Sequence, residues 1–170
     1  MSDHAFSIGT AKRFLEIVSP LPARQTQDAM LEALHGEGFT IAPGEYTSGP
    51  WSVRYGEIGD DSSSNWSGLL IELVPIVSLF GARRAFARCA VPVAVSAHPG
   101  GSRLLASTVW GFRGEGGTVG LVAKRVTAAA QVAAARVGGL LETSMSPIDR
   151  SAPFTLKQFD ELTGWKKRRA

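Results

Sequence analysis

The stretch Ala85–Phe112 constrains the fold of this 170-residue chain more than any other. Between Ala85 and Ala97, small apolar residues occupy alternate positions, and the positions between them are mixed or polar. A period of two residues predicts a strand with one buried face. The turn residues 98–101 then break the chain, and a second strand-like run extends from Leu104 to Phe112. The sequence therefore predicts a β-hairpin.

Two segments with a helical period lie on either side of this hairpin. After a strand-like run at 13–18, prolines precede a helix predicted over 23–35, and glycines end it. Between Thr118 and Val137, apolar residues recur at spacings of three and four, which indicates a long helix. Its many alanines would let this helix approach a sheet closely.

Further strands are predicted between the first helix and the hairpin. Residues 39–42 and 51–58 are two of them, and the apolar run 68–80 is interpreted as a buried strand that bends at Pro75. This run is shorter than the roughly 20 apolar residues that a membrane-spanning helix needs. The alternative for this run is a hairpin that dips into a membrane.

The order of these elements predicts a two-layer α+β domain. We expect an antiparallel sheet of about five to six strands, with the N-terminal helix and the long C-terminal helix packed on one face. Residues 1–10 are interpreted as a loose lead-in, residues 11–143 as the single domain, and residues 144–170 as a tail with a short helix and a basic end.

This order resembles the helix-grip fold of START and Bet v 1-like proteins and the smaller TATA-box-binding-protein-like fold. The resemblance rests on the first strand and helix (13–35), the hairpin (85–112) and the last helix (118–137). Members of such families commonly hold an apolar ligand between helix and sheet, so the resemblance implies a site there. The run between the first helix and the hairpin is shorter here than in the larger members.

Charge and composition exclude several classes of function. The net charge is +3, and the basic residues are scattered rather than gathered with aromatic residues on one face, so nucleic acid is not an expected partner. Cys89 is the single cysteine, and the three histidines lack metal-ligand spacing. We therefore expect no disulfide within the chain, no metal and no other cofactor. The N-terminus lacks the pattern of a secretory signal, which favours a cytoplasmic protein.

Four residues are candidates for contact with a ligand. Trp51 and Tyr55 share one face of their predicted strand, and Trp110 could join them from the hairpin. Such rings can line a flat apolar pocket, or they can fill the core beneath the last helix. Glu72 stands alone in the apolar run, where it could fix the polar end of a ligand. Alternatively, its carboxylate reaches water or pairs with a neighbouring arginine.

The end of the chain combines an aromatic residue with a basic cluster. An anionic membrane surface or another acidic partner could bind such a segment, and a solvated tail is the alternative. The candidate residues for membrane or partner contact are Trp165, Lys166, Lys167, Arg168 and Arg169.

Two functional hypotheses follow, and neither is catalytic. The first is a non-enzymatic module that binds an apolar or amphipathic molecule, such as a lipid, between the sheet and the C-terminal helix. The second is an interaction protein that docks on a protein partner, or peripherally on a membrane, through a sheet edge, segment 69–80 or the basic tail. A small enzyme is the least supported class, because no two polar groups are predicted to converge. Close packing between the long helix and the sheet would favour a surface-based role.

Overall fold

The computed structural model describes residues 14–58, 89–107 and 116–144. The predicted lead-in (1–10), the apolar run 68–80, residues 85–88 and 108–112 of the predicted hairpin, and the tail from residue 145 lie outside these ranges. The described elements in chain order are β1 (Phe14–Ser19), α1 (Ala23–Gly36), β2 (Thr40–Ile41), β3 (Tyr46–Ser48), β4 (Trp51–Ile58), β5 (Cys89–His98), β6 (Gly101–Ser107), α4 (Gly116–Val137) and β7 (Leu140–Ser144).

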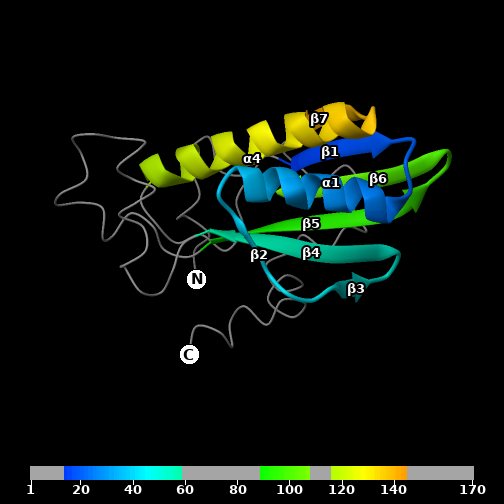
Figure 1. The fold of residues 1–170 in the computed structure, drawn as a ribbon, viewed down its shortest axis with the longest axis horizontal. Coiled ribbons are helices and arrows are strands. Elements are labelled where there is room, and N and C mark those ends of the chain that lie inside the picture. Colours follow the sequence, from blue (N-terminus) through cyan, green and yellow to red (C-terminus); the bar gives the residue numbers. More distant parts are fainter. Residues whose placement is uncertain (1–13, 59–88, 108–115, 145–170) are drawn as a thin grey trace.

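All described strands belong to one antiparallel sheet with both described helices on the same face (Figure 1). The strand order is β2-β4-β5-β6-β1-β7, and β3 also pairs with β4. The predicted α+β class with two helices on one face is therefore confirmed. Within the described ranges the sheet has seven strands, and two of them, β3 and β7, are not among the predicted strands.

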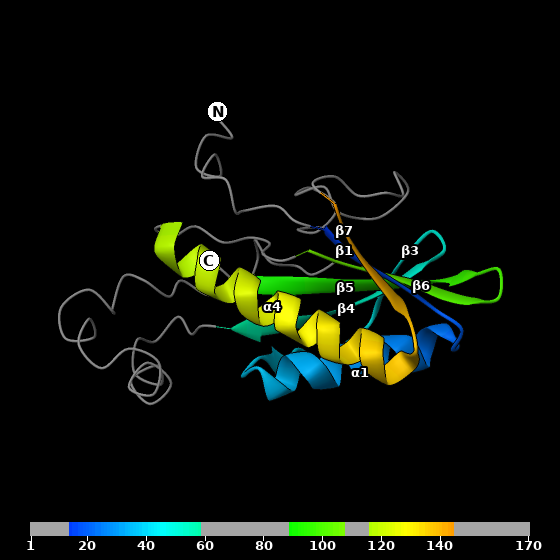
Figure 2. The same cartoon turned by 90° about the horizontal axis from the view of Figure 1, so that it is seen from above.

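Helix α4 covers the sheet through small side chains. Val122, Val126 and Val137 are buried in one apolar core together with four alanines of the same helix. Alanine at the contact brings a helix backbone close to its neighbours, and α4 lies beside α1 over the sheet (Figure 2). The prediction that the alanine-rich helix covers one side of the sheet is confirmed.

The layer between the helices and the sheet is filled with apolar side chains. The sheet contributes alternate residues from its central strands, and α1 contributes Met30 and Leu34, which are fully buried. The buried strand residues of this layer are Leu15, Ile17, Ile58, Val91, Val93, Val95, Leu104 and Ala106. Their spacing of two along each strand places them all on the helix-covered face.

Strand β5 is buried on both faces, which corrects the prediction of one buried face. The valines Val91, Val93 and Val95 point to the helices, but Ala90, Ala94 and Ser96, which have the other parity along the strand, are buried as well. A central strand covered on both sides needs small or apolar residues at every position, and valines that alternate with alanine, proline and serine satisfy this. The alternation in the sequence of β5 is therefore one of side-chain size, and it does not mark an exposed face.

Strand β7 follows α4 directly and was missed by the sequence analysis. Gly138 has a φ of +61°, a left-handed conformation that suits glycine and ends the helix. A Cβ at Gly139 would lie 2.8 Å from Cγ2 of Ile17 in β1, so this turn approaches β1 too closely for a side chain. The chain then runs antiparallel to β1 from Leu140 to Ser144.

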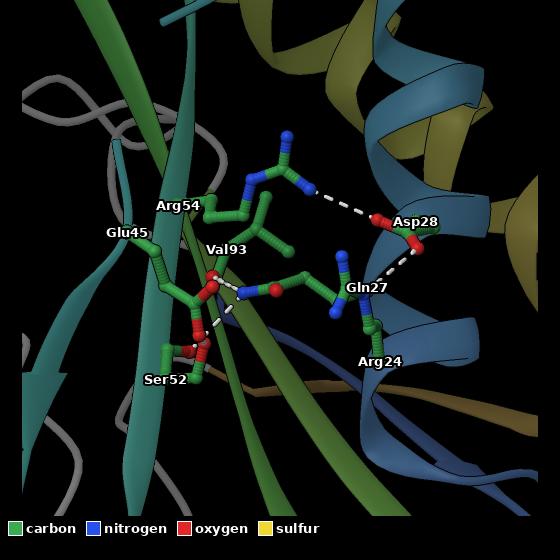
Figure 3. A network of polar contacts seen from close by, with 7 residues as sticks. All are labelled: Arg24, Gln27, Asp28, Glu45, Ser52, Arg54 and Val93. Atoms are coloured by element: carbon green, nitrogen blue, oxygen red, sulfur yellow. Dashed lines mark hydrogen bonds and ion pairs between the residues drawn. The ribbon is translucent and has the colours of Figure 1, made fainter. Parts of the chain in front are cut away.

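A polar network joins α1 to β4 and β5 (Figure 3). The amide Nε2 of Gln27, a buried residue of α1, donates to the carbonyl oxygens of Ser52 at 3.2 Å and Val93 at 3.0 Å. Beside it, Arg54 donates to the carboxylate of Asp28 at 2.9 Å. This network fixes α1 on the sheet because its donors and acceptors come from both layers.

Replacement of Gln27 tests this role. We expect Gln27→Ala to lower the free energy of unfolding by about 2 kcal/mol, because two carbonyl oxygens lose a buried donor. Gln25→Ala is the matched control on the exposed side of the same helix and should stay within about 0.5 kcal/mol of the parent. Urea denaturation measures both, and equal stability of the two variants would contradict a clamping role for Gln27.

Candidate functional site

The two described ligand candidates, Trp51 and Tyr55, lie on the face of the sheet that the helices do not cover. Both are buried, with 1% and 0% of their surface exposed. Arg54, which lies between them in β4, contacts Asp28 of α1 and therefore points to the helices. Trp51 and Tyr55 have the other parity along the strand, so their side chains point to the opposite face. The prediction of these rings beneath the last helix is therefore wrong. A period of two shows which residues share a face, but not which face receives the helices.

An aromatic cluster occupies this second face. The ring of Tyr46 in β3 stacks on that of Tyr55, with centroids 6.0 Å apart and an interplanar angle of 30°. Among the described residues, this cluster contains strand residues and Ala42 but no residue of α1 or α4. Its buried members are Phe14, Ala42, Trp51, Val53, Tyr55, Ala90, Ala94 and Leu105.

An ion pair between a buried glutamate and a half-buried arginine lies on the same face. In β1, Glu16 follows Phe14 at a spacing of two, and in β6, Arg103 precedes Leu105 in the same way. Nε of Arg103 lies 2.6 Å from Oε1 of Glu16, and the side chains are 26% and 4% exposed. Sequence reasoning singled out Glu72 as a lone acid in an apolar run, and Glu16 in Phe14–Ser19 carries the same signal.

The remaining candidate residues lie outside the described ranges. These are Glu72, Trp110, the basic segment 165–169 and segment 69–80. In the part of the chain that is described, no group of three or more acidic, histidine or cysteine side chains could hold a metal ion. No helix within these same ranges is long and apolar enough to cross a membrane.

The two edges of the described sheet differ in how they are protected. On one side, β2 and β3 have two and three residues, and Pro43 and Gly44 interrupt them. Short, interrupted strands and proline are devices that prevent a foreign strand from pairing. On the other side, β7 is continuous over five residues and contains neither proline nor a positive charge.

Strand β7 also exposes side chains that a partner could contact. Leu140 is 74% exposed, more than any other large apolar residue described, and Val132 of α4 follows at 50%. Glu142 is exposed and forms no ion pair within the described part of the chain. The residues Leu140–Ser144 are called the β7 edge below.

Comparison of the chain with protein-family models, curated proteins and solved structures finds no match. The resemblance to helix-grip and TATA-box-binding-protein-like folds stays a prediction.

The Glu16–Arg103 pair gives a test of the second face. Arg103→Met removes the cation that lies 2.6 Å from the buried carboxylate of Glu16, so we expect it to lower the free energy of unfolding by about 3 kcal/mol. The double variant Glu16→Met with Arg103→Met should recover more than half of this loss, because no charge then remains buried. Guanidinium denaturation measures both, and a double variant less stable than Arg103→Met would contradict this account.

Proposed function

We propose that the protein is a non-enzymatic interaction module that pairs with an extended segment of a protein partner along its β7 edge. The observation that supports this most is an uninterrupted edge strand carrying a highly exposed leucine, opposite an edge that is short and contains proline. An extended peptide that joins a sheet edge gains main-chain hydrogen bonds for affinity and side-chain contacts on both faces for specificity.

Packing elsewhere favours this surface-based role. The layer between the sheet and α4 holds fully buried side chains from both sides, among them Val126 and Leu104. An apolar ligand between the sheet and the C-terminal helix would have to displace these contacts. Binding at the edge displaces nothing in the described core, because Leu140, Glu142 and Thr143 are already exposed.

Selection of displayed peptides on the purified protein tests the proposal. We expect binders to lower amide hydrogen exchange in residues 140–144 and to leave residues 46–48 unchanged, because only the first segment offers a continuous edge. Leu140→Lys should weaken these binders, and Val132→Lys is the control at an exposed apolar residue of α4. Absence of binders, or protection only at other surfaces, would contradict docking at β7.

The second candidate function is binding of an apolar or amphipathic small molecule. The composition of this second face supports it, because aromatic and aliphatic side chains beside a few polar groups, here the Glu16–Arg103 pair, are typical of the lining of small-molecule sites. The ligand would lie on the face opposite the helices. Docking through segment 69–80 or the basic tail, on a protein or a membrane surface, also stays a prediction.

Mass spectrometry tests this second candidate. Protein purified without detergent should release a lipid or another apolar molecule on extraction with organic solvent. When the extracted molecule is added back to protein from which it has been removed, the melting temperature of the protein should rise. Extracts that contain no such molecule would remove the support for a ligand role.

A further inference from the structure

We infer that the partner segment at the β7 edge is an extended strand that places a basic residue opposite Glu142 and an apolar residue opposite Leu140. This inference rests on the proposed docking at β7 and specifies the chemistry of the partner. It follows from the register of β7 on β1 and from the charges on the face they share.

Glu142 lies directly opposite another carboxylate. In the antiparallel register of β1 and β7, Glu142 pairs with Glu16, so their side chains lie on the same face. Like charges directly opposite each other in a sheet are unfavourable. Arg103 neutralises Glu16, but it comes from β6, on the side of β1 away from β7. Glu142 thus faces a carboxylate on one side, and on the other side β7 is the last of the described strands.

A cation on the open side relieves this repulsion. A strand that pairs with β7 would bring a Lys or Arg opposite Glu142 to about 5 Å between Cβ atoms, which is the distance of a favourable cross-strand pair. The partner residue two positions further along the same face would lie opposite Leu140. Because Leu140 is exposed, an apolar side chain at that position would bury it. The whole sheet is antiparallel, so we take the added strand to be antiparallel as well.

A second copy of this chain fits the edge poorly. In a homodimer with a two-fold axis normal to the sheet, the two β7 strands would pair antiparallel. If all five residues of each strand paired, the central residue Glu142 would lie opposite Glu142 of the other copy. Each of these carboxylates already lies opposite Glu16, so a homodimer would extend the repulsion across its interface. The charge arrangement favours a basic partner strand over self-association.

A pair of synthetic peptides, acetylated and amidated, tests the inference on the intact protein. In TSVRVLT, antiparallel pairing places arginine opposite Glu142 and leucine opposite Leu140, and TSVEVLT differs only at the charged position. We expect TSVRVLT to bind about fivefold more tightly, as measured by fluorescence polarisation. Glu142→Arg should reverse the preference, whereas Glu45→Arg, a charge reversal near the opposite edge, should leave it unchanged.

The outcomes separate this inference from the proposed function. Equal affinity of the two peptides, or no binding of either, would overturn the basic-strand inference. If selected peptides still protected residues 140–144 from hydrogen exchange, docking at β7 would stand. Failure of both experiments would remove both. A dimer that Leu140→Lys dissociates would show that a second copy occupies the edge, and would also overturn the inference.

Discussion

The described sheet depends on the pairing of β1, because this strand joins the two ends of the described chain. Phe14–Ser19 pairs with β6 on one side and with β7 on the other, over almost its full length in both cases. Neither pairing is local in sequence, so the sheet closes only when the first strand lies between segments that come much later in the chain. Helix α4 then lies over β1 and beside α1, and it covers the helix-facing layer.

Burial on both faces follows from the same arrangement. Residues of one parity in β1, β5 and β6 meet the helices, and residues of the other parity meet the aromatic cluster or the Glu16–Arg103 pair. On the second face, β5 carries the small side chains of alanine and serine. The large rings of Trp51 and Tyr55 on the neighbouring strand β4 are buried on this same face. The polar residues Gln27 and Glu16 are accommodated because each has a partner from another element.

Local patterns in the sequence predict most of the described elements but not their assembly. The bounds of α1, β4 and α4 follow from proline, glycine and the period of the apolar residues, and the observed bounds differ little from the predicted ones. The face of β4 that meets the helices was not predictable from alternation alone, and Trp51 and Tyr55 were placed on the wrong one. β7 was missed because Leu140–Ser144 is short and mixed in polarity, and only its pairing with β1 makes it a strand. The charge contact of Glu16 with Arg103 depends on a register that the sequence does not specify.

The contrast between the two edges limits how many chains can add to this sheet. A sheet with two open edges can grow without end, because each added molecule offers a new edge to the next. Here Pro43, Gly44 and the short strands beside β4 block one direction of growth. If a partner strand pairs with β7 as proposed, the complex would have a fixed stoichiometry, because the opposite described edge resists pairing with a further chain.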